Sequence, residues 1–208
     1  MKVVVTRAEM QADELVARLE AVGHDVVRCP LIRIEPLGDE AIDPSPYDWV
    51  VVTSPNGAHE LARRLTVTPQ RLAAIGPATA AALRSHGLRV DLVPVLRTQA
   101  GLLAELPPDG RVLLAAAEGA RRLLVDQRGA DFLPLYRTIE LHPPAPDGDV
   151  ALLASASAAR AFAATGARMP VVAIGPQTAA EAREHGLEVA RVAETQDVDG
   201  LLDALASL

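Results

Sequence analysis

An internal repeat constrains the fold of this chain more than any other feature of its sequence. Residues 74–80 are AIGPATA, and residues 173–179 are AIGPQTA. The match stays in register through further short segments, HGL at 86–88 and 185–187 and GLL at 101–103 and 200–202. The chain is therefore expected to contain two copies of one folding unit.

Short β-branched runs alternate with helical patterns along the chain. Residues 3–6 predict a strand, residues 11–21 a helix, and residues 24–28 the next strand. Further along, a helical pattern over 78–86 is followed by a predicted strand over 90–93. Strands that alternate with helices are typical of parallel sheets covered on both faces, so the predicted fold class is doubly wound α/β.

The two halves do not follow one another as a simple tandem. The strand–helix–strand pattern of residues 1–28 resembles that of residues 110–135, so the units occur in the order A, B, A, B. An extended stretch with prolines at its ends follows each A unit. If both stretches run between domains, the middle of the chain is one domain and its two ends form the other. A tandem divided near residue 107 is the alternative, and the repeat alone leaves both open.

Composition argues against several classes of protein. The formal net charge of −7 disfavours a general nucleic-acid binder. No apolar run reaches the roughly 18 residues that a membrane helix needs. Cys29 is the only cysteine, so a disulfide within the chain is impossible, and the sequence enters a predicted strand after Met1 without a signal-peptide pattern. We therefore expect a cytoplasmic protein.

Three turns have the features of a helix start that binds anions. Gly76 and Gly175 each follow a predicted strand and precede a proline that opens a helix, and Ser54 precedes Pro55 in the same way. Amides at such a start favour an anion by about 0.3–1 kcal/mol when exposed. Plain helix capping explains any one of these turns equally well. Several of them around one site would favour ligand binding, which in this fold occurs beyond the carboxyl ends of the strands.

Motifs of several common enzyme classes are absent from the sequence. It contains no P-loop, no G-x-G-x-x-G fingerprint, no G-x-S-x-G elbow and no H-E-x-x-H motif. The acidic residues show no pairing suited to a metal, and no metal site is predicted. His86 and His185 precede matching glycines at predicted helix ends, where a cation suits the helix dipole. The residues alone thus indicate a two-domain α/β protein with an anion-binding cleft.

Taken together, these features resemble the uroporphyrinogen-III synthase family along essentially the whole chain. The order of several short motifs and the duplicated layout carry the resemblance. The matching segments are Thr6-Arg7, TSPNG at 53–57, IGPAT at 75–79, EGAR at 118–121, LYRT at 135–138 and IGPQT at 174–178. The chain departs from the family pattern at Ala8, where proline is common, and at 154–157, where ASAS replaces a TSP-like turn.

The resemblance implies two doubly wound parallel-sheet, flavodoxin-like domains joined by a two-stranded β-ladder, with the active site between them. This layout favours the crossing arrangement over the tandem. We therefore predict a discontinuous first domain of residues 1–33 and 142–208 and a second domain of residues 38–132. The interdomain strands are predicted at 30–37 and 133–141.

The resemblance also implies an activity in heme and porphyrin biosynthesis. Hydroxymethylbilane, a linear tetrapyrrole rich in carboxylates, would be cyclised to uroporphyrinogen III with inversion of ring D and loss of water. Such a lyase needs no cofactor, because its main task is to position a flexible and reactive substrate. Tyr136 is the implied catalytic group, assisting departure of the hydroxyl, and packing of its ring against the hinge is the alternative. The implied substrate-binding residues are Thr6, Arg7, Ser54, Asn56, Gly57, Gly76, Thr79, Glu118, Gly119, Arg121, Ser155, Ser157, Gly175 and Thr178.

The expected partners are hydroxymethylbilane as substrate and hydroxymethylbilane synthase as a transient contact. The protein itself is expected to be a monomer, with no nucleic-acid or membrane partner. The competing hypothesis is a non-catalytic two-domain module that binds a small anionic ligand and has no need of Tyr136. A phosphosugar enzyme is disfavoured because no general base or metal cluster is visible. A fused regulator is disfavoured because no helix-turn-helix segment is appended.

Overall fold

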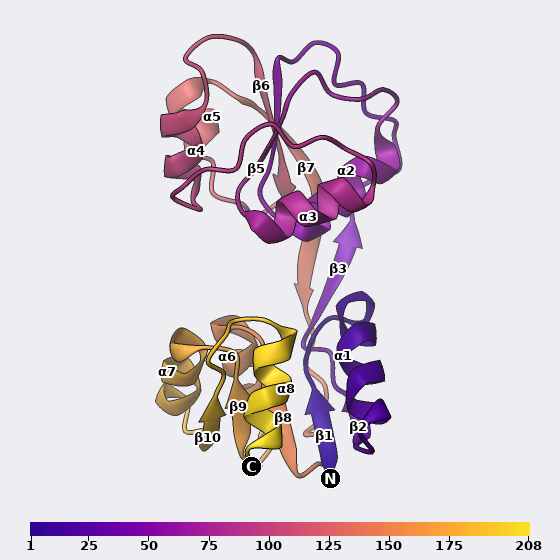
Figure 1. Ribbon diagram of the computed structural model, residues 1–208, viewed down its shortest axis with the longest axis vertical. Helices are drawn as coiled ribbons and strands as arrows, with labels where there is room; N and C mark the ends of the chain where they lie inside the picture. Colours follow the sequence, from indigo (N-terminus) through magenta and orange to yellow (C-terminus); the bar gives the residue numbers. More distant parts are fainter. The chain divides into compact units, whose positions relative to one another are not determined.

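The computed structural model describes residues 1–208, with the side chain of Met10 left out of the description. The chain divides into two compact units (Figure 1). Unit 1 consists of Met1–Arg33 and Ile139–Leu208, and unit 2 consists of Ile34–Thr138. Among the residues described, no helix combines the length and the apolar character needed to cross a membrane.

Unit 1 contains a five-stranded sheet in the order β10-β9-β8-β1-β2. Its strands are β1 (Lys2–Val5), β2 (Asp25–Arg28), β8 (Val150–Leu153), β9 (Val171–Ala173) and β10 (Val189–Val192). Each neighbouring pair is parallel. Valine and other β-branched or aliphatic residues dominate these strands, which suits a sheet buried on both faces.

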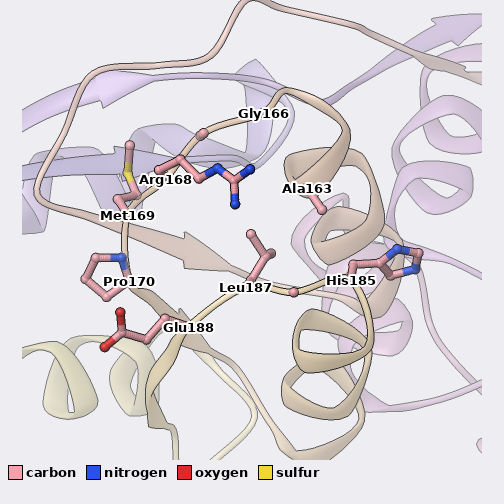
Figure 2. Close-up of a pocket in the computed structure, with 10 residues that line it drawn as sticks. Ala163, Gly166, Arg168, Met169, Pro170, His185, Leu187 and Glu188 are labelled. Carbon is pink, nitrogen blue, oxygen red and sulfur yellow. The ribbon is translucent and has the colours of Figure 1, made fainter.

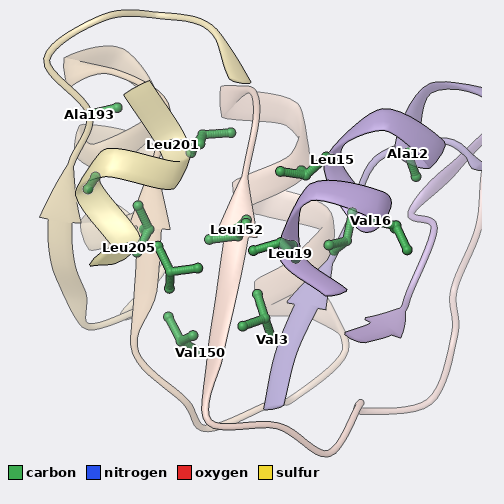
Figure 3. Packing of buried hydrophobic residues seen from close by; sticks show 13 residues of the cluster. Val3, Ala12, Leu15, Val16, Leu19, Val150, Leu152, Ala193, Leu201 and Leu205 are labelled. Atoms are coloured by element: carbon green, nitrogen blue, oxygen red, sulfur yellow. The ribbon is translucent and has the colours of Figure 1, made fainter. Parts of the chain in front are cut away.

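Helices cover both faces of the unit 1 sheet. Successive residues of a strand point to opposite faces, so each face packs against its own pair of helices. Val3 and Val5 pack with α1 (Glu9–Ala21) and α8 (Val198–Ala206) in one core cluster, which Figure 3 shows. Val4 points to the other face, where α6 (Ala156–Ala164) and α7 (Pro176–Glu184) supply buried residues that include Phe162 and Ala182.

Unit 2 also contains a five-stranded sheet, in the order β3-β7-β6-β4-β5. Its strands are β3 (Ile32–Pro36), β4 (Trp49–Val52), β5 (Leu72–Ala74), β6 (Val112–Ala117) and β7 (Asp131–Glu140). On one face lie α2 (Pro55–Arg64) and α3 (Pro77–Ser85). On the other face lie α4 (Gln99–Glu105) and α5 (Leu123–Arg128). Parallel strands with helices on both faces confirm the predicted α/β fold class.

The boundaries between the two units fall within β3 and β7. Leu37 N donates to Leu135 O at 2.8 Å, and Leu141 N donates to Leu31 O at 2.9 Å. The partner's number falls as the residue number rises, so these two segments run antiparallel. Chain order also differs between the units: in unit 2 the β4–α2–β5–α3 segment precedes β6, whereas in unit 1 its counterpart follows β1.

The strand predicted over residues 90–93 is wrong. Leu92 forms only an isolated bridge with Ala73, whereas the equivalent segment of unit 1 forms β10. The Leu72 N–H donates to the Asp91 carboxylate at 3.0 Å, so a side chain takes the place of a strand carbonyl. Pro94 then lacks the N–H that a continuing strand would need.

Candidate active site

The candidate site residues of unit 2 follow the carboxyl ends of its parallel strands. Ser54 lies just beyond β4, Gly76 just beyond β5 and Glu118 directly after β6. The pairing of β4 with β5 and with β6 is parallel, so these three turns share one edge of the sheet. This edge is where ligands bind in open α/β sheets.

Ser54 makes two contacts at the start of α2. As the N-cap residue, with φ −161° and ψ 155°, it accepts a hydrogen bond from Gly57 N at 3.0 Å. Its Oγ also lies 2.8 Å from the Tyr136 hydroxyl, and either oxygen can be the donor. Because Oγ already accepts from Gly57, its own proton is available for the Tyr136 oxygen. In that arrangement the phenolic O–H is left to donate to a ligand.

Gly57 permits this geometry. A Cβ at Gly57 would lie 3.1 Å from Ser54 Oγ and 3.4 Å from a methyl carbon of Val52. The distance to Ser54 Oγ is tighter than ordinary van der Waals contact, so a larger residue would press on the serine that meets Tyr136. Asn56 lies beside Gly57 in the first turn of the same helix.

Tyr136 belongs to β7 and is only 5% exposed. Its ring packs in the core cluster with Leu135, Leu113 and Ala115. Its backbone carbonyl accepts from Glu118 N at 2.8 Å, which ties the end of β6 to β7. The ring therefore packs in the core, and the hydroxyl meets Ser54.

A pocket of about 470 Å³ opens beside Ser54. It is lined by Thr53, Ser54, Pro55, Ile75, Gly76, Pro77, Ala78, Thr79 and Arg97. Gly76 caps α3 without a side chain, and Thr79 lies buried in the first turn of that helix. The Arg97 side chain packs against Gly76: a Cβ built on the glycine would lie 3.7 Å from Arg97 Cδ. The pocket thus combines two helix starts, hydroxyl groups and one cation.

The turn after β6 is less compact. At Gly119 a Cβ would meet no atom within 4 Å, so this glycine faces open space. The Arg121 carbonyl accepts from Gln99 Nε2 at 2.5 Å, which attaches its backbone to the beginning of α4. Among the residues described, Arg121 forms no hydrogen bond or ion pair with Ser54 or Tyr136, so the structure does not bring this predicted residue to the pair.

The matching edge of unit 1 holds Ser155, Ser157, Gly175 and Thr178. Ser155 caps α6 by accepting from Ala158 N at 3.1 Å, and its Oγ lies 3.0 Å from Ser157 Oγ. Gly175 caps α7 without a side chain, and Thr178 is buried in the first turn. A Cβ at Gly175 would lie 3.0 Å from Gln196 Cδ. Gln196 thus takes the place that Arg97 has in unit 2.

Thr6 and Arg7 follow β1 in unit 1. Thr6 is 2% exposed, and its hydroxyl donates to Leu152 O at 2.8 Å, so it joins the ends of β1 and β8. Burial lowers the pKa of the Arg7 guanidinium, and the nearby Glu14 opposes that shift. A half-buried cation of this kind is stabilised when an anion binds beside it.

Comparisons with known proteins decide the family. The sequence model of the family described as uroporphyrinogen-III synthase HemD matches residues 13–203 of the chain. This protein belongs to the uroporphyrinogen-III synthase family. The resemblance inferred from the short motifs is thereby confirmed.

Individual members of the uroporphyrinogen-III synthase family are distant from this chain. A uroporphyrinogen-III synthase from Synechococcus elongatus is 30% identical over 105 residues, covering 44% of this chain and 40% of that protein. A porphyrin biosynthesis protein HemD from Ruminiclostridium josui is 25% identical, and the match covers 100% of this chain and 48% of that protein. The matched regions therefore span less than half of these curated relatives.

A solved member of the uroporphyrinogen-III synthase family shares the fold. The crystal structure of a mutant uroporphyrinogen III synthase from Thermus thermophilus matches with a TM-score of 0.61 and 20% sequence identity. The match covers 100% of this chain and 98% of that one.

Arg97 is not among the residues predicted from the sequence, although it lines the pocket beside Ser54. The signal was present in the repeat: Arg97 precedes the N-cap residue Thr98, as Gln196 precedes the N-cap residue Asp197. Alignment of the two copies would have shown a cation replacing a neutral side chain beside a glycine-capped helix. The contact of Arg97 with Gly76, however, depends on how the segment between α3 and α4 folds.

A second pocket of this protein, about 330 Å³ in volume, lies in unit 1 (Figure 2). It is formed by the carboxyl-terminal ends of α6 and α7 and by the segments entering β9 and β10, with Arg168, His185 and Glu188 on its walls. The amino ends of parallel strands lie opposite the edge that holds Ser155 and Gly175. We therefore assign this pocket no part in the candidate active site.

Proposed function

We propose that this protein is a uroporphyrinogen-III synthase, a lyase that cyclises hydroxymethylbilane to uroporphyrinogen III, inverts ring D and releases water. Membership of the family supports the proposal, and one observation carries it for this chain. The Tyr136 hydroxyl lies 2.8 Å from Ser54 Oγ, at a helix start beside a pocket that contains a cation. A hydrogen-bond donor for the leaving hydroxyl, next to groups suited to carboxylates, is what the substrate's chemistry requires.

The reaction begins with loss of the terminal hydroxyl of the substrate as water, in which the N–H proton of the same pyrrole ring completes the water molecule. We assign Tyr136 to donate a hydrogen bond to this leaving group, and Ser54 to orient the phenol by donating to its oxygen. The resulting electrophilic azafulvene is attacked by the substituted carbon of ring D. The spiro intermediate formed in this step fragments and closes again with ring D inverted. A phenol is a weak acid, so its assistance is hydrogen bonding rather than full proton transfer.

The carboxylates of the substrate provide the means of positioning. In unit 2 the starts of α2 and α3 offer amides, Thr79 a hydroxyl and Arg97 a guanidinium. In unit 1 the starts of α6 and α7 and the half-buried Arg7 offer the same kinds of group. Binding at helix starts needs no lysine-rich surface, which accords with a chain of net charge −7. Positioning of this kind selects the inverted product over spontaneous closure.

The roles of all the predicted substrate-binding residues, including Asn56, Glu118, Gly119 and Arg121, stay predictions. A monomeric state, a cytoplasmic location and a transient contact with hydroxymethylbilane synthase stay predictions as well.

The proposal is tested by a coupled assay with freshly generated hydroxymethylbilane. The products are oxidised to porphyrins and separated by isomer. A large excess of isomer III over the spontaneous isomer I is expected. Isomer I alone from folded protein would refute the enzyme and favour a binding module for an anionic ligand.

A further inference from the structure

Two histidines meet on the surface of unit 2, away from the Ser54–Tyr136 pair. His59 lies on α2, and His86 is the C-cap residue of α3. His59 Nδ1 lies 2.7 Å from His86 Nε2. The rings are arranged edge to face, with their centroids 5.0 Å apart, and both side chains are exposed.

Unit 1 joins the equivalent helices by different chemistry. Arg160 follows the capping Ser155 at the same spacing as His59 follows Ser54, and His185 caps α7 as His86 caps α3. In unit 1, Arg160 Nη1 lies 2.8 Å from Glu181 Oε1, and His185 Nε2 lies 3.2 Å from the same oxygen. The contact between α2 and α3 in unit 2 therefore consists of two imidazoles, whereas the contact between α6 and α7 in unit 1 is an ion pair.

Two imidazole nitrogens at this distance suit one metal ion. With metal–nitrogen bonds of about 2.0–2.1 Å, two adjacent ligands of one ion lie roughly 2.9–3.4 Å apart. The nitrogens are already at 2.7 Å, so exposed side chains need only a small rotation to reach that separation. In the absence of a metal, one ring donates a hydrogen bond to the other; when a metal binds, the donor ring carries its proton on its other nitrogen, so that both lone pairs point at the ion.

The surroundings favour nitrogen-preferring cations. Glu60, the carboxylate next to His59, is held by Arg63 at 2.8 Å. Throughout the described side chains, no group of three or more His, Cys, Asp or Glu residues is placed to hold a metal. A neutral pair of imidazoles suits Zn²⁺, Ni²⁺ or Cu²⁺, whereas Mg²⁺ and Ca²⁺ require oxygen ligands.

We propose that His59 and His86 form a surface site for one divalent transition-metal ion, with water completing its coordination. The ion links α2 to α3, as the Arg160–Glu181 pair links α6 to α7 in unit 1. The site is independent of the proposed reaction, because the metal occupies neither the pocket beside Ser54 nor the Tyr136 hydroxyl.

The test uses the full chain without an affinity tag, stripped of metal with a chelator and then dialysed. Titration with Ni²⁺ in a calorimeter is expected to show one equivalent bound, and a saturating excess is expected to raise Tm by roughly 5 °C. Mg²⁺ at the same concentration is expected to change nothing. With Cu²⁺, the electron paramagnetic resonance spectrum is expected to show coupling to two imidazole nitrogens.

Variants separate this pair from the other histidines. His59→Ala and His86→Ala are each expected to weaken Ni²⁺ binding at least tenfold, and His59→Arg, which copies unit 1, is expected to do the same. The matched control is His185→Ala, which removes the equivalent C-cap residue and is expected to bind as the wild type does. Equal binding by the wild type and the His59/His86 double variant would overturn the proposal. A copper spectrum with coupling to one nitrogen would overturn it independently of any variant.

Discussion

The carboxyl edges of the two sheets have the same framework and different chemistry. Serine caps at Ser54 and Ser155 and glycine caps at Gly76 and Gly175 recur in both units. The residues placed against these caps do not recur. Besides its capping bond, Ser54 Oγ meets the Tyr136 hydroxyl, whereas Ser155 Oγ meets Ser157 Oγ.

Alignment of the two proline-flanked stretches explains part of this difference. PLYR at 134–137 corresponds to PLIR at 30–33, so Ile32 holds the place of Tyr136. Likewise Gln196 lies against Gly175 where Arg97 lies against Gly76. The duplicated scaffold therefore provides serine-capped and glycine-capped helix starts in both units. The phenol and the additional cation at these positions distinguish unit 2.

The largest effect is expected from Tyr136→Phe, which keeps the buried ring and removes the hydroxyl that unit 1 lacks. We expect the rate of isomer III formation to fall at least about tenfold, because assistance to the leaving group is lost. Initial rates in the coupled assay measure this effect. Tyr47→Phe, at the only other tyrosine, is the matched control and should leave the rate unchanged. An unchanged rate in Tyr136→Phe would remove the hydroxyl from the mechanism.

Ser54→Ala and Ser155→Ala compare the two serine caps directly. Each loses the hydrogen bond to a first-turn amide, so each should lose about 1 kcal/mol of stability in urea unfolding. Only Ser54→Ala also removes the partner of Tyr136, and we expect a several-fold lower kcat in that variant alone. If both variants lost activity equally, the distinction between the two edges would fail.

Arg97→Gln gives unit 2 the residue found at the matching position of unit 1. An exposed contact between Arg97 and a substrate carboxylate should contribute about 1 kcal/mol to binding. Its loss should raise KM roughly fivefold with little change in kcat. Steady-state kinetics with hydroxymethylbilane measure both constants. The control Arg168→Gln, in the pocket at the opposite edge of unit 1, should leave KM unchanged, and a KM unaltered by Arg97→Gln would exclude Arg97 from binding.

The smallest effect concerns two helices at matching positions of the repeat, α4 of unit 2, capped by Thr98, and α8 of unit 1, capped by Asp197. Hydrogen bonds from Gly200 N and then from the Thr195 hydroxyl hold the pKa of the Asp197 carboxyl below its ordinary value. Its stabilising contribution is therefore present above the unfolded-state pKa of about 3.9 and is lost as pH falls through the lower folded-state pKa.

Urea midpoints of Asp197→Ala and Thr98→Ala, each set against the wild type over a range of pH, measure this difference. The deficit of Asp197→Ala should shrink in acid, whereas the deficit of Thr98→Ala should stay constant. A deficit of Asp197→Ala that grew in acid would contradict the assigned sign.

Local sequence determined the scaffold of this protein. The alternation of strand and helix patterns predicted the α/β class, because burial on both faces imposes a readable periodicity. The proline after each residue predicted the caps at Ser54, Gly76 and Gly175, because capping depends on residues only a few positions apart. The histidines predicted at helix ends are indeed C-cap residues, since the glycines after them adopt positive φ.

Tertiary structure decided the contacts that distinguish one edge from the other. Ser54 and Tyr136 are 82 positions apart, and Arg97 reaches Gly76 only through the turn before α4. The strand predicted at residues 90–93 is absent where the Leu72 N–H donates a hydrogen bond to the Asp91 side chain. No local sequence pattern indicates that contact. The meeting of His59 and His86 likewise follows from packing of α2 against α3. Such contacts depend on which residues the folded chain brings together, whereas helix and strand periodicity records only which face of each element is buried.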